Sequence, residues 1–335
     1  MTDKKEIKCG VIGYGGAFNM GKLHAQWMNA SPGMRTVSVC DTDESRLSVA
    51  REELGEVFVC SSLADLLASD IDLVVIITPH NTHYSIAMEA LKAGKHVVLE
   101  KPMCITVDEA TDMIEAAKKS NVVLTVFHNR RLDGDYKAIK EVIDKGLLGE
   151  IFHIEAYMGG CGHPGKWWRA CKEISGGLFY DWGAHIVDWT LNFYQGRKIE
   201  SITGFFHKKV WMDVTNEDQV QALVRFDNGA VADIQMSQIA RAGKPRWRIL
   251  GTKGAIVDTG GGSFKVFTEV EGYPAEMDIN YKKSTWEDWY PNLAKHLLEG
   301  APLQVKAEEA RRVIQVLSFA EKSAKSGKSV PAEFD

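Results

Sequence analysis

Short apolar runs alternate with amphipathic segments through the first 128 residues of the chain. The runs predicted as strands are 7–12, 34–40, 57–60, 73–77, 96–99 and 122–127, and the segments predicted as helices are 21–30, 43–54, 81–93 and 107–119. The run LVVII at 73–77 is almost purely β-branched, as expected for a parallel strand covered on both faces. Regular alternation of strand and helix predicts a doubly wound parallel sheet of the α/β class.

The pattern changes after a predicted helix at 133–145. Strand-like runs then follow one another at 150–158, 199–206, 218–226, 230–237, 246–250 and 264–269, with helices predicted at 184–194, 287–298 and 307–324. Turn signals such as Asp227-Asn228-Gly229 separate the strands. This part therefore predicts a mostly antiparallel sheet, and we expect two domains, 1–128 and 129–335.

Composition narrows the classes of function. The 335 residues carry a net charge of −5. Proteins that bind nucleic acids or anionic membranes normally carry an excess of positive charge, so this charge disfavours both classes. No run of about 18 apolar residues occurs, and the N-terminal MTDKKEIKCG has no apolar segment. The six cysteines are scattered through a chain long enough to fold without disulfides, which indicates reduced thiols. We expect a cytoplasmic protein with a small-molecule partner.

A glycine-rich turn follows the first predicted strand. Gly13, Gly15 and Gly16 permit a tight turn and let the backbone approach a pyrophosphate, while the next helix presents free N–H groups. The third glycine of the G-x-G-x-x-G pattern is displaced: Phe18 occupies its place, and Gly21 comes three residues later. The turn therefore predicts a dinucleotide site with a lengthened loop.

Asp41 ends the second predicted strand, 28 residues after Gly13. A carboxylate at this point can accept hydrogen bonds from ribose hydroxyls and would repel a 2′-phosphate, so the sequence favours NAD over NADP. Two alternatives stay open. Asp41 could instead cap the helix that starts near Asp43, and Arg46 could reach a phosphate.

Four landmarks occur in a fixed order along nearly the whole chain. They are Thr78-Pro79-His80-Asn81-Thr82-His83, the run AGKHVVLEKP that ends at Glu100-Lys101-Pro102, Asn129-Arg130-Arg131, and the later glycine pair with Asp181, His185 and Asp188. In these features the chain resembles the glucose-fructose oxidoreductase and inositol dehydrogenase family, often called Gfo/Idh/MocA. His24 is displaced together with Gly21 relative to that family, which indicates one local insertion.

The resemblance implies an N-terminal Rossmann domain, a C-terminal α+β domain with a large open sheet, and a substrate cleft between them. It also implies assembly into homodimers or homotetramers, often through the outer face of that sheet. By analogy with the family, the cofactor-binding residues also include Thr78, Pro79, His80, His83, Glu100 and Lys101. Capping of a helix by Asn81 is the alternative role for part of that run.

Lys101 follows the predicted strand 96–99, at the sheet edge where open α/β folds bind ligands. A lysine there can bind the reacting oxygen, and its alternative role is an ion pair with Glu100 or a surface position. Asp181 and His185 lie four residues apart, on one face of a helix if the helix begins this early. An imidazole can take a hydroxyl proton while a carboxylate orients it or binds a substrate hydroxyl.

The resemblance assigns Lys101, Asp181 and His185 to the catalytic group. We also expect all three to contact the substrate. Asp188 is read as structural, and capping of the helix is the alternative for Asp181.

Aromatic and polar residues gather before the glycine pair. Trp168, His163 and Arg169 are predicted to bind substrate, since flat aromatic faces suit the C–H faces of pyranose rings and arginine can bind hydroxyls. Tryptophan is also common in cores, so packing is the alternative. Cys161, His163 and Cys171 could be read as zinc ligands, but their spacing matches no compact zinc motif, and we predict no metal.

The sequence therefore predicts an NAD-dependent oxidoreductase that transfers a hydride between a ring secondary alcohol of a sugar, cyclitol or glycoside and nicotinamide. Two alternatives stay open. Some family relatives retain NAD and cleave glycosides through transient oxidation and elimination, and a non-catalytic dinucleotide or sugar sensor has the same architecture. Net accumulation of NADH distinguishes the dehydrogenase from both.

Overall fold

The computed structural model describes residues 6–194 and 196–334, so the ends of the two predicted domains, 1–5 and 335, lie outside the described residues. The chain divides into two compact units. The first contains the chain up to His128 together with Glu287–Ala310, and the second contains Asn129–Trp286 and the chain from Arg311 onward. Residues 287–310, which the sequence assigned to the second domain, pack with the first unit.

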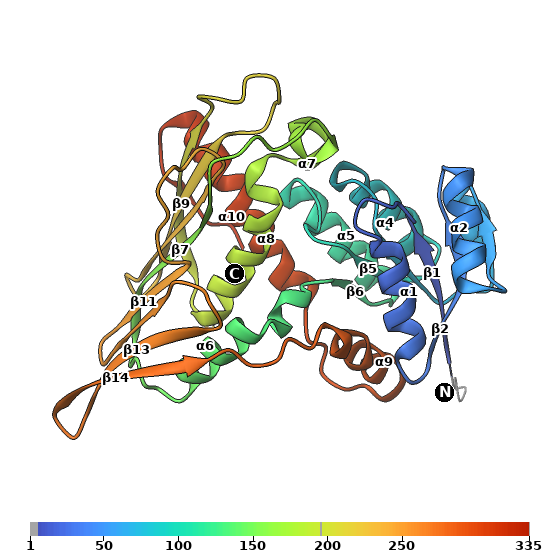
Figure 1. Ribbon diagram of the computed structural model, residues 1–335. Helices are drawn as coiled ribbons and strands as arrows, with labels where there is room; N and C mark the ends of the chain where they lie inside the picture. The colour runs from blue at the N-terminus through green and yellow to red at the C-terminus, as the bar shows by residue number, and fades with distance from the viewer. Residues whose placement is uncertain (1–5, 195, 335) are drawn as a thin grey trace. The chain divides into compact units, whose positions relative to one another are not determined.

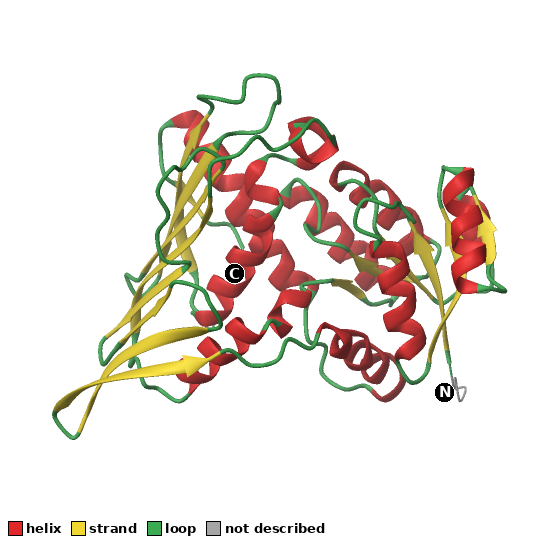
Figure 2. Cartoon of the chain, in the orientation of Figure 1, coloured by secondary structure: helices red, strands yellow, loops and turns green. Residues whose placement is uncertain are grey.

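The first unit is a parallel sheet of six strands in the order β3-β2-β1-β4-β5-β6 (Figures 1 and 2). Its strands are β1 (Ile7–Ile12), β2 (Met34–Cys40), β3 (Phe58–Cys60), β4 (Leu73–Ile76), β5 (His96–Leu99) and β6 (Leu124–Val126). The helices are α1 (Met20–Ala30), α2 (Glu44–Leu54), α3 (Leu63–Ala68), α4 (His83–Lys92), α5 (Val107–Ser120) and α9 (Trp289–Glu299). Order reverses between β1 and β4, the place where doubly wound sheets bind ligands.

Local sequence explains the regularity of this unit. The central strand β4 is buried at every position, as its β-branched residues predicted. Helix α5 begins with a capping box in which Thr106 and Glu109 each satisfy the other's backbone N–H, and it ends at Asn121 in the left-handed conformation. The return segment joins the same core, since Thr125 Oγ1 donates to the Val305 carbonyl at 2.8 Å.

The second unit is built on a sheet of nine strands in the order β14-β13-β12-β11-β7-β10-β9-β8-β15. The strands are β7 (Ile151–Gly159), β8 (Ile199–His207), β9 (Gln219–Phe226), β10 (Val231–Ser237), β11 (Trp247–Gly251), β12 (Ala255–Asp258), β13 (Ser263–Val270), β14 (Tyr273–Asn280) and β15 (Val330–Pro331). The helices are α6 (Gly134–Asp144), α7 (Lys172–Ser175), α8 (Trp182–Phe193) and α10 (Ala307–Ser326), whose first turn belongs to the first unit. Only β7 and β10 pair in parallel among the described ladders of this sheet.

Helices cover one face of the large sheet (Figure 2). Helix α8 packs on β7 and β10, and α10 approaches β8 so closely that a Cβ at Gly204 would lie 1.9 Å from the Ala320 carbonyl oxygen. Trp189 and Trp247 pack in the core between helix and sheet, with their rings tilted by 49° and the ring centroids 5.8 Å apart. The predicted combination of an α/β domain and an α+β domain is confirmed.

All six cysteines are free, and Cys9, Cys40, Cys60 and Cys104 are buried. Among the described helices, none has both the length and the apolar character needed to span a bilayer.

Candidate active site

The glycine turn connects β1 to α1 through two glycines that no other residue could replace without strain. Gly13 has φ of 95°, and a Cβ there would lie 3.0 Å from the Ile77 carbonyl oxygen. A Cβ at Gly21 would lie 2.8 Å from the Gly13 carbonyl oxygen, because the first turn of α1 lies against the strand. Gly21 thus permits close packing of helix and strand, which is the role of the third glycine in the G-x-G-x-x-G pattern.

The Asp41 carboxylate binds the backbone of this turn. Its Oδ2 accepts a hydrogen bond from the Tyr14 N–H at 2.6 Å, and its Oδ1 accepts from the Asp43 N–H at 2.9 Å. The N-cap of α2 is Asp43, whose side chain accepts from the Ser45 N–H. The Arg46 Nε donates to the Tyr14 carbonyl at 2.8 Å. A carboxylate and a guanidinium therefore both lie beside the glycine turn.

His83 joins two loops that leave the ends of neighbouring strands. Its ring is fully buried, with Nε2 2.9 Å from the Thr78 carbonyl oxygen and Nδ1 2.9 Å from the Pro102 carbonyl oxygen. Burial lowers the pKa of His83, and the hydrogen bonds to the Pro102 and Thr78 carbonyls oppose this effect only in part. His80 is also buried, with its ring centroid 5.9 Å from that of His83. The two histidines fix the loop that begins with Thr78 and Pro79.

Glu100 and Lys101 come directly after β5. The Glu100 Oε2 accepts a hydrogen bond from the Lys101 N–H at 3.0 Å, and its Oε1 lies 2.9 Å from His24 Nε2. Burial opposes ionisation of this carboxyl, but the hydrogen bond and electrostatic attraction of His24, followed by the charge of Lys101, outweigh burial and lower the pKa of Glu100. Lys101 itself is half-buried. His24, which the sequence marked only as a displaced landmark, is thus part of this cluster.

Asp181 and His185 lie at the start of α8 in the second unit. The helix begins at Trp182, so Asp181 is its N-cap rather than its first residue, and its side chain makes no capping hydrogen bond. The Asp181 Oδ1 instead accepts from Arg169 Nη1 at 2.6 Å. His185 is buried, and its ring lies 5.6 Å from the Trp182 ring. The predicted acid–base pair therefore sits within one helical turn, with Arg169 bound to the carboxylate.

An ion-pair network holds the glycine turn that precedes this helix. The Glu217 Oε2 accepts from the Leu178 N–H at 3.1 Å, and Glu217 also pairs with Lys172. Lys172 in turn lies 2.8 Å from Glu321 on α10. Although burial disfavours its charge, hydrogen bonds to both carboxylates raise the pKa of Lys172. These residues carry no local motif, and the sequence predictions did not include them.

The loop between β7 and α7 carries the other predicted substrate residues. His163 Nε2 lies 3.0 Å from Asp213 Oδ1, and its Nδ1 accepts from the Gly165 N–H. The Arg169 guanidinium lies 5.0 Å from the centroid of the Trp168 ring, a cation–π contact. His163 is exposed, whereas Trp168 and Arg169 are half-buried. Arg169 thus bridges the aromatic side chains of this loop and Asp181.

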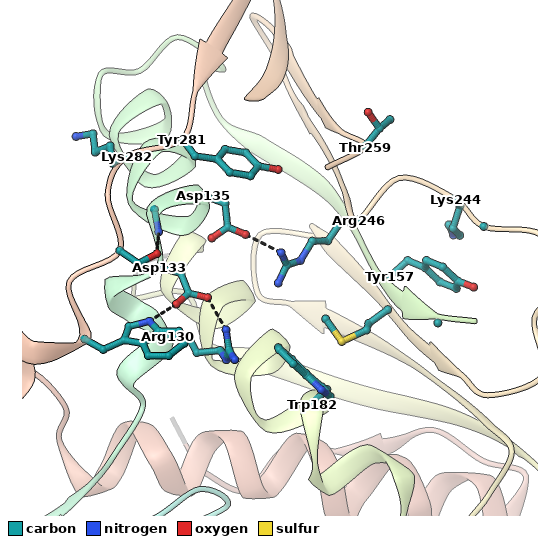
Figure 3. A pocket seen from close by; sticks show the side chains of 16 residues that line it. Arg130, Asp133, Asp135, Tyr157, Trp182, Lys244, Arg246, Thr259, Tyr281 and Lys282 are labelled. Carbon is teal, nitrogen blue, oxygen red and sulfur yellow. Dashed lines mark hydrogen bonds and ion pairs between the residues drawn. The ribbon is translucent and has the colours of Figure 1, made fainter. Parts of the chain in front are cut away.

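A cavity of about 640 Å³ lies in the second unit beside Trp182 (Figure 3). Arg130 stacks over Trp182 at 4.4 Å from its ring centroid and donates to Asp133 Oδ2 at 2.9 Å. Asp135 accepts from Arg246 at 2.8 Å across the cavity. Burial outweighs the Arg130 charge and raises the pKa of Asp133. The sequence marked Arg130 as a landmark but gave no signal for the cavity's other charged residues.

Arg131 and Asp188 form a buried pair, with Nε 2.8 Å from Oδ2 and Nη2 2.5 Å from Oδ1. This bidentate contact supports the structural reading of Asp188. Across the described residues, no three His, Cys, Asp or Glu side chains are grouped as metal ligands would be. Cys171 donates instead to Glu173, and Cys161 is exposed.

Comparison with known proteins covers both halves of the chain. Residues 7–128 match an oxidoreductase family with an NAD-binding Rossmann fold, and residues 136–257 match the GFO/IDH/MocA C-terminal domain. The chain is 27% identical to scyllo-inositol 2-dehydrogenase (NADP(+)) IolW of Bacillus subtilis, over 98% of this chain and 96% of that protein. It is 29% identical to scyllo-inositol 2-dehydrogenase (NAD(+)) of Bacillus subtilis, over 75% of this chain and 73% of that protein.

A solved structure of the yvaA oxidoreductase of Bacillus subtilis superposes with a TM-score of 0.89. Its sequence is 25% identical, and the match covers 99% of this chain and all of the other. The fold is therefore shared over the full length.

Proposed function

Because the chain belongs to the Gfo/Idh/MocA family of oxidoreductases, we propose that it is an NAD-dependent dehydrogenase acting on a ring secondary alcohol of a cyclitol, sugar or glycoside. The observation that carries the proposal is the pair at the start of α8, where buried His185 follows Asp181 within one turn. Imidazole and carboxylate at this spacing suit removal of a hydroxyl proton while hydride leaves the same carbon.

The residues of the first unit fit a dinucleotide. Gly13 and Gly21 let α1 pack closely on β1, and a Cβ at Gly15 would meet nothing within 4 Å, so a pyrophosphate can approach the backbone and the helix N-terminus. Bound NAD supplies the hydride acceptor at its nicotinamide. Thr78, Pro79, His80 and His83 form the loop that we assign to the nicotinamide end, with Glu100 and Lys101 beside it.

The chain's own residues carry the proton and the charge. His185 accepts the proton of the substrate hydroxyl, and Lys101 stabilises the oxyanion that develops as hydride departs. Asp181, held by Arg169, orients a substrate hydroxyl. His163 and Trp168 contact the ring, and the cavity beside Trp182 receives the remainder of the substrate. In the reverse direction His185 returns the proton and a ketone is reduced.

Asp41 supports NAD as the cofactor. Its carboxylate lies against the glycine turn through the Tyr14 N–H, where it can bind ribose hydroxyls and repel a 2′-phosphate. Arg46 makes the opposite contribution, since a guanidinium attracts phosphate. The relatives named above include one NAD and one NADP enzyme, so both nucleotides belong in every assay.

We also propose a homodimer or homotetramer formed through the large sheet. Phe152, Phe205 and Phe267 are 49%, 46% and 38% exposed on its strands, so a partner subunit that covers the sheet would remove apolar surface from water. Light scattering of the purified protein, with Phe205→Ser as the variant, tests the assembly.

The decisive test of activity is NADH formation from NAD with a panel of inositols, free sugars and aryl glycosides. Lys101→Met should retain cofactor binding and lose at least about a thousandfold in kcat, because charge stabilisation at the oxygen is removed. Unchanged turnover in Lys101→Met would overturn the assignment. Release of an aglycone without net NADH would identify a cofactor-recycling glycosidase, and binding without turnover would identify a sensor.

A further inference from the structure

A buried chain of hydrogen bonds runs through the first unit to the backbone of Lys101. The Tyr290 hydroxyl lies 2.5 Å from His24 Nδ1, and His24 Nε2 lies 2.9 Å from Glu100 Oε1. The other carboxylate oxygen of Glu100 accepts the Lys101 N–H at 3.0 Å. His24 and Tyr290 are fully buried. Tyr290, His24 and Glu100, which are distant in sequence, are thus linked by successive hydrogen bonds to the backbone of Lys101. Lys101 is the residue that we propose stabilises the reacting oxygen.

Three elements bring the chain together. His24 lies on α1, Glu100 follows β5, and Tyr290 lies on α9 in the segment that returns to the first unit. The His24 ring packs 4.4 Å from Phe127 and 5.7 Å from Trp27, measured between ring centroids. The imidazole is therefore fixed on its faces by aromatic rings and on its nitrogens by hydrogen bonds.

The acceptors determine where the protons lie. Glu100 Oε1 is a carboxylate oxygen and can only accept, so His24 Nε2 carries a hydrogen. In the tautomer that carries its hydrogen on Nε2, Nδ1 accepts from the Tyr290 hydroxyl. Burial raises the pKa of Tyr290 far above its ordinary value, so the phenol keeps the proton that it donates. In this arrangement every donor in the chain of hydrogen bonds has an acceptor.

We propose that His24 and Tyr290 are positioning residues for Lys101, which hold the Glu100 carboxylate so that it anchors the Lys101 backbone and supplies a fixed counter-charge during hydride transfer. The inference rests on the proposed function, in which Lys101 stabilises the reacting oxygen. In a Ser-His-Asp triad, a buried carboxylate orients the catalytic histidine through a hydrogen bond. Here the histidine, His24, orients the carboxylate of Glu100. Neither residue touches substrate or cofactor in this scheme.

We call the hydrogen-bonded series Tyr290, His24 and Glu100 the relay. It predicts losses of turnover that a role in packing alone would not produce. Tyr290→Phe removes one hydroxyl and leaves the ring, so kcat should fall about threefold to tenfold while KM for NAD changes less than threefold. His24→Leu removes the donor to a charged carboxylate and should lower kcat about 10- to 100-fold. His24→Gln retains an N–H donor near the position of Nε2 and should restore most of that loss.

Tyr194→Phe is the matched control. Tyr194 is also buried, and its hydroxyl donates to the Val231 carbonyl at 3.0 Å within the second unit. The two Tyr→Phe variants should lose similar stability in urea unfolding, while only Tyr290→Phe loses turnover. Equal turnover in the two variants would overturn the relay.

Combination with Lys101→Met separates this inference from the proposed function. If the relay acts through Lys101, adding Tyr290→Phe to Lys101→Met should leave residual turnover unchanged, because the two effects are not additive. A further full loss in the double variant would overturn the relay, and normal turnover in Lys101→Met alone would overturn the proposed function.

A measurement on the unmodified protein covers the case in which variants fail to fold. Nitrogen NMR of the His24 ring should report hydrogen on Nε2 and a lone pair on Nδ1. Hydrogen on Nδ1 alone would contradict the proposal.

Discussion

The candidate site residues of the two units are held in different ways. In the first unit, Asp41, His83 and Glu100 each bind backbone N–H or carbonyl groups at the ends of parallel strands. In the second unit, Asp181 is held by a charged side chain and its supporting turn by an ion-pair network. Backbone contacts follow from the fold, whereas ion pairs depend on single side chains far apart in sequence. The second unit should therefore be the more sensitive to substitution and to pH.

The largest effect should come from the proposed acid–base pair, Asp181 and His185. His185→Ala should lower kcat by about 10²- to 10⁴-fold, because the acceptor of the hydroxyl proton is removed. Fluorescence titration with NAD should give unchanged binding. His153→Ala, a half-buried histidine of β7 that pairs with Glu155, is the control and should keep normal turnover. Equal losses in both variants would mean that His185 acts only through packing.

The supporting turn should be the next most sensitive feature. Gly177 has φ of 114°, and a Cβ there would lie 2.6 Å from Glu217 Oε2, so Gly177→Ala should destabilise the protein by about 2 kcal/mol or more. Gly229 also has positive φ but an open surrounding, and Gly229→Ala should cost only about 1 kcal/mol. Urea unfolding measures both. If the two losses were equal, contact with the Glu217 network would contribute nothing.

The backbone-bound carboxylate of the first unit offers a milder test. Asp41→Ser should shift the ratio of kcat/KM for NADP over NAD upward by roughly tenfold, since repulsion of the 2′-phosphate is relieved while Arg46 remains. Asp43→Asn removes one charge from the same turn and keeps an N-cap side chain, so it serves as the control. An unchanged ratio in Asp41→Ser would remove the basis for preferring NAD.

The smallest effect concerns acid stability. Although burial opposes its ionisation, hydrogen bonds from Lys172 and Lys325 lower the pKa of Glu321 below its ordinary 4.5. A depressed folded-state pKa contributes stability above that ordinary value, and the contribution is lost as pH falls through the folded value. Glu321→Gln should therefore cost about 1 kcal/mol at pH 7 and less near pH 3.

Thermal unfolding across that range measures the acid effect. Glu44→Gln, which removes a carboxylate in an exposed pair with Arg51, should leave the pH profile unchanged. A parallel loss for Glu321→Gln at both pH values would contradict the ion-pair account.

The same contrast explains what the sequence could and could not predict. The strand run at 73–77 and the glycine turn at Gly13 are local signals, and the Rossmann sheet follows from them. Strand β14 was not predicted, although Ala275, Met277 and Ile279 alternate with exposed polar residues, because Pro274 near its start and its lack of buried positions weaken the signal of a strand. The parallel pairing of β7 with β10, and the contact of Glu217 with Lys172, join segments far apart in the chain. Only tertiary packing brings such groups together.

The return of α9 to the first unit has a consequence for synthesis. Domains of a growing chain generally fold as they emerge, the N-terminal one first. Here the ribosome must add about 160 residues after His128 before Tyr290 can reach His24, a delay of roughly ten to thirty seconds at 5–20 residues per second. Until then the core of the nascent Rossmann sheet is incomplete around Phe127, which packs against Tyr290 in the finished protein. The segment that completes this core is translated only after every strand of the large sheet except the last, β15.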